Sequence, residues 1–213
     1  MDPWESLAEW CEEHALKTRS AILPPSTSYE ISAAQGGTGG ILWPEDVLAF
    51  YEWRNGLERT PDGYLFPGLR PLRIDEVVAN WQSFMDIAYE DVRPSPPPRD
   101  ADSRMTFYGQ LAVDVIGPEC AQPAGSVTGR FIPSLLPIAE DQNGSYLMID
   151  RRGGKEFGAA VFYDKVDADL NDAPRWKSFL ALSRATLQAV ISETPEEQTG
   201  LTPIALGGRL IWQ

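Results

Sequence analysis

The stretch FIPSLLPIAEDQNGSYLMIDRRGGKEFGAAVFY, residues 131–163, decides the fold class of this chain. Its first two apolar runs lie on either side of Asn143-Gly144, and an Asn-Gly pair in that position is the strongest short-range signal for a β-hairpin. Residues 151–155, RRGGK, provide a second turn, after which residues 157–163 form a third apolar run. The pattern therefore predicts a three-stranded antiparallel meander.

Helical patterns precede and follow the meander. Asp2, Pro3 and Glu5 have the spacing of an N-cap, a first helical residue and a capping-box partner, which predicts a helix from there to about Lys17. The same kinds of start and stop signals, together with apolar periods of 3.6 residues, predict the remaining elements. We expect helices from Thr27 to the glycine run 36–40, over 43–56, over 74–88 and from Pro174 to before Pro195, and short strand pieces at 64–66 and 69–72. The fold class is therefore α+β, with an antiparallel sheet flanked by helices.

The domain organisation follows from where these patterns stop. Regular structure is interrupted between residues 86 and 128, where four prolines and a charged run, 99–104, lie close together. We interpret 86–128 as an insertion in which 111–116 could form one strand. We expect residues 1–195 to form a single domain and residues 196–213 to form a tail that adds a strand.

The charge of the chain limits its partners. The 18 Lys and Arg residues against 31 Asp and Glu residues give a net charge of −13, which repels phosphate backbones and anionic lipid. This balance is consistent with simple solubility and also with attraction to a basic protein partner. No apolar run is long enough to span a bilayer, and Cys11 and Cys120 lie far apart without a metal-site spacing. We therefore expect a cytoplasmic protein that binds neither nucleic acid nor membrane directly.

Several motifs that could carry chemistry are incomplete. The segment from Asp167 begins like a calcium loop, but Asp172 stands where the turn needs glycine and Ser178 stands where a bidentate glutamate is needed. The glycine run 36–40 lacks the Lys-Ser/Thr element of a phosphate cradle, and His14 is the only histidine. We therefore expect no metal, no cofactor and no enzyme activity.

The order of the elements resembles the SUKH superfamily, the SMI1/KNR4-like immunity and regulatory proteins. The resemblance rests on the Trp-rich first helix, WPED at 43–46 leading to Asn55-Gly56, Ile132-Pro133, IAEDQNG at 138–144, and Ile149-Asp150. It covers residues 1–85 and 130–192, with Trp43 where the family usually has leucine and Gln35 where it usually has glutamate. It implies an α+β fold with a curved sheet beside helices. In bacteria it commonly implies an immunity protein that neutralises a polymorphic toxin, often a nuclease, whereas fungal relatives look like regulatory scaffolds.

Three functions are compatible with these observations. The first is stoichiometric inhibition of a basic toxin domain by an acidic surface, the second is an intracellular regulatory scaffold, and the third is an acid–base hydrolase built from surface carboxylates. The oligomeric state is left open. We expect most tryptophans in the core, and turn chemistry next to Asn143-Gly144 explains Asp141 better than catalysis does. The candidate partner-binding residues combine aromatic anchors with a charged rim: Trp43, Asp46, Tyr51, Trp53, Trp81, Asp141, Asn143, Asp150, Tyr163, Asp164, Asp167 and Asp169.

Overall fold

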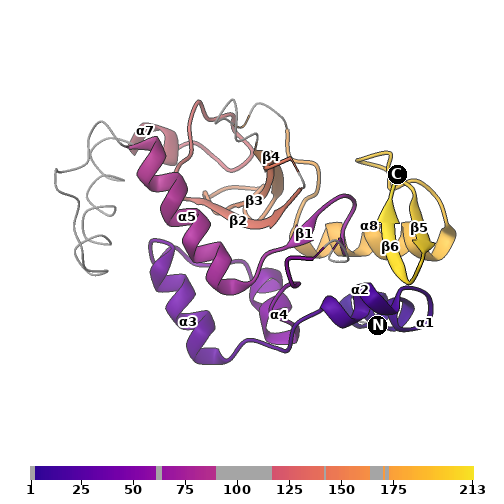
Figure 1. The fold of residues 1–213 in the computed structure, drawn as a ribbon. Coiled ribbons are helices and arrows are strands. Elements are labelled where there is room, and N and C mark those ends of the chain that lie inside the picture. The colour runs from indigo at the N-terminus through magenta and orange to yellow at the C-terminus, as the bar shows by residue number, and fades with distance from the viewer. Residues whose placement is uncertain (1–2, 61–63, 90–116, 142, 164–169, 171–172) are drawn as a thin grey trace.

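The computed structural model describes residues 3–60, 64–89, 117–141, 143–163, 170 and 173–213, which form one body of helices and strands (Figure 1). Its centre is an antiparallel sheet with the strand order β1-β2-β3-β4. A separate hairpin is formed by β5 and β6 near the C-terminus. The strands are β1 (Arg70–Pro71), β2 (Leu135–Glu140), β3 (Tyr146–Asp150), β4 (Ala160–Tyr163), β5 (Pro203–Leu206) and β6 (Arg209–Trp212).

The predicted meander is confirmed as β2, β3 and β4. β2 and β3 pair from Leu135 opposite Asp150 to Glu140 opposite Tyr146, and a register shift between Pro137 and Ala139 bends β2. Nearly every residue of β2 and β3 is buried, rather than every second one, so both faces of the sheet are covered. β4 begins at Ala160 because the preceding residues form a turn.

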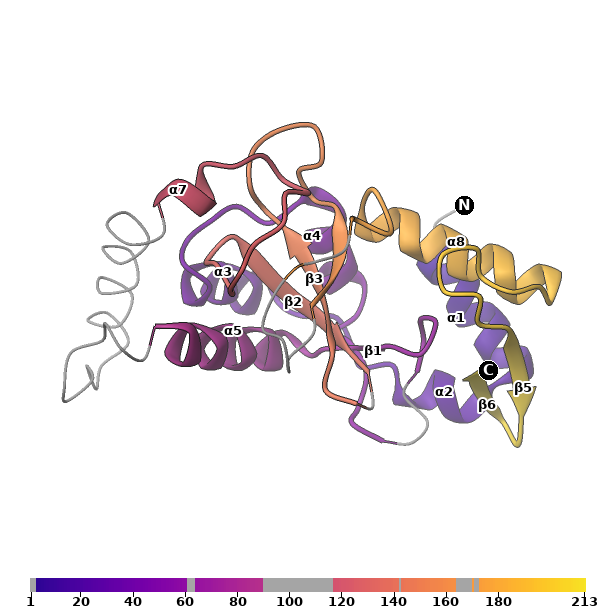
Figure 2. The ribbon, with the colours of Figure 1, turned by 90° about the horizontal axis from the view of Figure 1, so that it is seen from above.

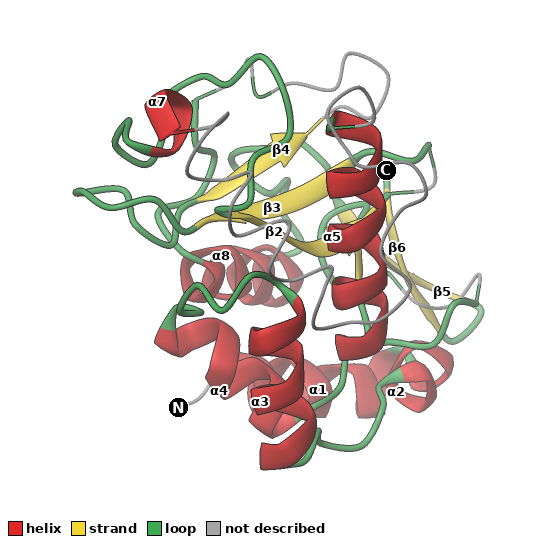
Figure 3. Cartoon of the chain, turned by 90° about the vertical axis from the view of Figure 1, so that its left-hand side faces the viewer, coloured by secondary structure: helices red, strands yellow, loops and turns green. Residues whose placement is uncertain are grey.

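Three helices correspond closely to the predicted ones. They are α3 (Ser28–Gly37), α4 (Glu45–Trp53) and α5 (Ile74–Ala88). A capping box starts α3, since Thr27 Oγ1 accepts from the N–H of Glu30 at 3.2 Å while Glu30 accepts from the N–H of Thr27 at 2.7 Å. α3 and α5 lie side by side next to the sheet (Figures 1 and 3).

We had expected the glycine run to begin where α3 ends, but the run begins inside the helix. Gly36 and Gly37 belong to the last turn of the helix. A Cβ atom on Gly37 would lie 2.9 Å from Val78 Cγ1, so glycine allows α3 and α5 to approach closely at this point.

The first predicted helix is two helices, α1 (Pro3–His14) and α2 (Leu16–Ala21), because Ala15 leaves the helical conformation with φ −141° and ψ 54°. The last helix, α8 (Phe179–Ser192), starts later than Pro174. Ser178 caps it by accepting from the N–H of Ala181, while Trp176 lies outside the helix and bridges to Ala160 of the sheet. Tertiary pairing of Trp176 has therefore displaced the helix start.

The two ends of the chain pack together into a unit that we call the terminal layer: α1, α2, α8, β5 and β6 (Figure 2). Trp4 Nε1 donates to Ser183 Oγ at 2.6 Å, which joins α1 to α8. The N–H of Leu210 donates to Thr18 Oγ1 at 2.9 Å, which joins β6 to α2. The tail was expected to add one strand, and it forms a hairpin instead.

The expected insertion is only partly described. α5 continues into it as far as Ala88, and α7 (Gly117–Cys120) lies near its end. Further on, Thr128 bridges to Leu170. The strand expected at 111–116 lies outside the described residues.

Candidate functional site

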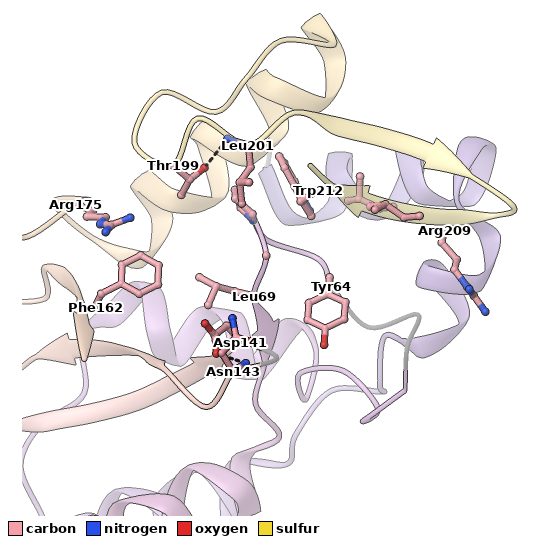
Figure 4. Close-up of a pocket in the computed structure, with 14 residues that line it drawn as sticks. Tyr64, Leu69, Asp141, Asn143, Phe162, Arg175, Thr199, Leu201, Arg209 and Trp212 are labelled. Atoms are coloured by element: carbon pink, nitrogen blue, oxygen red, sulfur yellow. Dashed lines mark hydrogen bonds between the residues drawn. The ribbon is translucent and has the colours of Figure 1, made fainter. Parts of the chain in front are cut away.

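A cleft beside the β2–β3 turn contains two of the predicted binding residues, Asp141 and Asn143 (Figure 4). Its volume is about 580 Å³. Asp141 Oδ1 accepts hydrogen bonds from the backbone N–H groups of Asn143 and Ser145, both at 2.8 Å. The carboxylate of Asp141 therefore fixes the turn, as its position next to Asn143-Gly144 indicates, and Asn143 is left exposed at the turn.

The other walls of this cleft, which we call the turn–tail cleft, come from segments far apart in the sequence. Phe162 of β4 lies under the guanidinium of Arg175, with 4.2 Å between Arg175 Cζ and the ring centroid, a cation–π contact. Tyr64 precedes β1, and Trp212 belongs to β6. Figure 4 shows Leu69 between Phe162 and Tyr64. The cleft is thus lined by aromatic, cationic and hydrogen-bonding side chains where the sheet meets the terminal layer.

Four aromatic residues expected in a partner-binding anchor lie in the core: Trp43, Tyr51, Trp81 and Tyr163, each at most 3% exposed. Trp43 Nε1 donates to Thr38 Oγ1 at 3.0 Å, and the Tyr51 hydroxyl donates to the carbonyl of Leu72 at 3.0 Å. Trp81 Nε1 donates to the carbonyl of Pro133 at 3.1 Å. Their placement corrects the expectation of a surface anchor, because these rings fill the core. The polar atoms of Trp43, Tyr51 and Trp81 are hydrogen-bonded inside it.

Asp150 is also buried, which corrects its expected place on a binding surface. Its carboxylate accepts from Arg152 Nη2 at 2.7 Å and from the backbone N–H of Gly125 at 2.8 Å. Arg152 in turn donates to the carbonyl of Ser126 at 2.6 Å. The pair therefore ties the 124–126 segment to the end of β3.

Asp46 and Trp53 are partly buried and join helices to one another. Asp46 Oδ2 accepts from the N–H of Leu180 at 2.8 Å, which links the starts of α4 and α8. Trp53 Nε1 donates to Glu5 Oε2 at 2.6 Å, which links α4 to α1. Neither residue lines the turn–tail cleft. The remaining predicted residues, Asp164, Asp167 and Asp169, lie outside the described part of the chain.

The strongly shifted titratable groups belong to the core. Burial lowers the pKa of Arg151 to about 9, and Arg151 donates to the carbonyl oxygens of Pro133, Thr38 and Ile41. Burial raises the pKa of Cys11 to about 12, so its thiol stays protonated at neutral pH. Within the described residues, no three His, Cys, Asp or Glu side chains gather as metal ligands would.

Sequence analysis missed Tyr64, Arg175, Arg209 and Trp212 as site residues. No local motif marks them, and only packing of the tail against the sheet brings them to one cleft. The available signal was residue type, since Tyr, Trp and Arg are enriched among the residues that dominate protein interfaces.

The chain was compared with models of known protein families. The model of the SMI1 / KNR4 family (SUKH-1) matches residues 25–182, which is most of the chain. The chain belongs to the SMI1/KNR4 family. The SUKH match begins before α3 and ends inside α8, so α1, α2, β5 and β6 lie outside it. The resemblance seen in the sequence had included the first helix, which the family model leaves out.

Among curated proteins, none matches this chain at a significant level. In the part of this SUKH protein that the structure describes, no helix has the length and apolar character required to cross a membrane.

Proposed function

We propose that this SUKH protein acts in the cytoplasm as an immunity protein, binding a polymorphic toxin stoichiometrically and blocking it without catalysis. Family membership supports this proposal, because SUKH proteins are commonly immunity proteins of polymorphic toxin systems. The observation that supports a particular binding site for the toxin is the turn–tail cleft. The cleft is lined both by the exposed β2–β3 turn, which belongs to the family fold, and by residues of the tail, which lies outside the family match.

The chemistry of the turn–tail cleft fits a protein surface. Tyr64, Phe162 and Trp212 offer large, stiff contact areas, and Arg175 is held in place by its contact with Phe162. Such side chains supply most of the binding energy at protein interfaces when they are enclosed by a partner. A toxin loop that entered the cleft would also meet Asp141, whose carboxylate already accepts from the N–H groups of Asn143 and Ser145 before binding, so less entropy is lost in ordering it.

The acidic character of the chain favours a basic toxin domain. A net charge of −13 raises the encounter rate with a cationic partner. We propose that Asp164, Asp167 and Asp169 contribute to this attraction. The proposal requires no bound metal or cofactor.

The test is capture of the partner from the native cell on the immobilised protein, read by mass spectrometry. We expect a secreted toxin or its C-terminal toxic domain, bound one to one and inhibited in the complex. Tyr64→Ala should weaken capture by about tenfold or more. The matched control is Phe157→Ala, which removes an exposed aromatic ring outside the cleft. Capture of endogenous signalling proteins and no toxin would favour the regulatory scaffold instead.

A further inference from the structure

A second concavity lies between α3 and α5, on a different part of the family fold from the turn–tail cleft, with which it shares no lining residue. Its volume is about 690 Å³. We call it the α3–α5 groove. Its floor and walls are mainly apolar, and three acidic residues lie among the residues that line it. The apolar contributors include Leu23, Pro24, Ala33, Ile74 and Val78.

The groove is held open by fixed contacts. The close approach of Gly37 to Val78 brings the helices together, and the groove lies on the N-terminal side of that contact. The carbonyl of Pro24 accepts from the N–H of Asn55 at 2.9 Å, and Asn55 Oδ1 accepts from the N–H of Ile74 at 2.7 Å. Because the segment before α3 and the start of α5 are both hydrogen-bonded to Asn55, a ligand would find the groove already formed.

The rim of the groove is negatively charged. Glu30, Glu58 and Asp75 are exposed carboxylates on it, whereas Arg73 is the one basic residue that lines it among those the structure describes. Arg73 is engaged by Asp75, since Arg73 Nε donates to Asp75 Oδ1 at 3.0 Å. Hydrogen bonds from Thr27 lower the pKa of Glu30, and the hydrogen bond from Arg73 lowers the pKa of Asp75. Both carboxylates are therefore charged at neutral pH.

Tyr29 is the most exposed large hydrophobic residue in the part of the chain that the structure describes. It is 82% exposed at the groove, although tyrosine carries a large apolar ring whose burial is favourable. An aromatic side chain beside an apolar groove, with carboxylates around it, has the arrangement of an interface hot spot surrounded by a charged rim.

We infer that the α3–α5 groove binds a basic amphipathic segment of the protein partner, with apolar side chains on the floor and Lys or Arg side chains at Glu30, Glu58 and Asp75. This inference rests on the proposed function, because it names the part of the partner that the groove recognises. The rim repels nucleic acid and also repels a second copy of this chain, whose net charge is −13. Charge complementarity therefore selects a cationic segment.

The probe is a short fluorescent helical peptide with leucine at the i, i+3, i+4 and i+7 positions and lysine elsewhere, and its control has glutamate in place of lysine. Binding to the full chain is measured by anisotropy at low and at physiological salt. We expect saturable binding of the lysine peptide alone. Tyr29→Ala should raise Kd by about tenfold, and Glu58→Gln with Asp75→Asn should raise it by about fivefold at low salt.

The matched control removes the same number of charges elsewhere, through Glu9→Gln with Glu13→Gln on the exposed side of α1. It should change Kd by less than about twofold, since the lost charges are far from the bound peptide and screened. Equal losses from the two pairs, equal binding of the glutamate peptide, or no saturable binding would each overturn the inference.

The inference and the proposed function fail separately. If Tyr29→Ala and the rim variant still capture the native partner as well as the unchanged protein does, the groove is not the docking site, although the immunity role stands. If no toxin is captured while the peptide still binds at the groove, the groove recognises a basic segment of another protein.

Discussion

Asp150 and Arg152 form an ion pair in which both side chains are fully buried, with 2.7 Å between Asp150 Oδ2 and Arg152 Nη2. Taking two charges out of water costs several kcal/mol for each ion, and the pair offsets this only while both partners are present. Arg152 Nη1 has no hydrogen-bond partner among the described residues, so the guanidinium depends strongly on Asp150.

Replacing Asp150 by Asn should therefore destabilise the protein by about 3–5 kcal/mol, because a buried guanidinium loses its counter-charge. The measurement is the free energy of unfolding from urea titration. The double variant Asp150→Asn with Arg152→Met should regain part of the loss, since no charge is then left unpaired. Asp141→Asn, at an exposed turn, is the control and should cost about 1 kcal/mol or less. A cost for Asp150→Asn no larger than this control would contradict the account.

Individual residues were the hardest part of the site to predict. Tyr51 and Trp81 were expected at a partner surface because aromatic rings are common there, but the same property places them in a core. Sequence gives the chemical type of a side chain, whereas its exposure depends on which helix face meets the sheet. Asp141 was predictable because its hydrogen bonds are made within four residues of itself.

At the scale of elements, helices and hairpins were predicted correctly where the sequence carries both an apolar period and a clear start or turn signal. α5 begins and ends where the apolar period predicted, and the β2–β3 hairpin forms about Asn143-Gly144. The tail hairpin had a local signal that we overlooked, because Gly207-Gly208 lies between the paired residues Leu206 and Arg209 and both glycines have positive φ, as a two-residue hairpin loop requires. The late start of α8 depends instead on a partner distant in sequence, since Trp176 bridges to Ala160.

Gly56, which follows α4, allows the chain after this helix to pack directly against the backbone of Leu72. It has a φ of +68°, and a Cβ atom there would lie 2.3 Å from the carbonyl oxygen of Leu72. Gly200 also has a positive φ, +71°, but a Cβ atom there would meet nothing within 4 Å. Both glycines therefore adopt a positive φ that disfavours other residues, but only at Gly56 would an added Cβ atom also clash with the backbone.

We expect Gly200→Ala to cost about 1 kcal/mol, the usual penalty of a left-handed conformation for a residue with a Cβ atom. Gly56→Ala should cost that amount plus the displacement of the Leu72 backbone, about 3 kcal/mol or more in total. Thermal and urea unfolding of both variants measure the difference. Equal destabilisation would mean that the chain relaxes freely around Leu72.

At the scale of the whole molecule, the family fold is completed by residues outside the family match. Trp4 packs edge-on against Phe50, with 5.9 Å between ring centroids, and lies 6.5 Å from Phe179. Leu7 and Cys11 on the same helix are fully buried. α1 therefore covers an apolar surface that α4 and α8 would otherwise expose to water.

A chain that starts at residue 25 should consequently be much less stable than the full chain. Losing α1 and α2 exposes Phe50 and Phe179 and removes the Trp4 bond to Ser183, and burial of one such aromatic side chain alone contributes about 1.5–3 kcal/mol. We expect a lower melting temperature and binding of a hydrophobic dye. Trp4→Phe in the full chain should cost much less, because it keeps most of the ring contacts. An unchanged melting temperature for the shortened chain would refute this packing role.

The net charge of −13 acts on the whole molecule and should appear in the rate of partner binding. Exposed charges steer encounter over a screening length of about 8–10 Å at physiological salt, so association with a basic toxin should slow by roughly tenfold or more from low to high salt. Replacing Asp164, Asp167 and Asp169 together by Asn should slow association further than replacing Glu9, Glu13 and Glu197 by Gln, because charges near the interface steer encounter more than distant ones do. Stopped-flow measurement with the captured partner tests both statements. A salt-independent rate would leave the apolar contacts of Tyr29 and Tyr64 as the source of affinity.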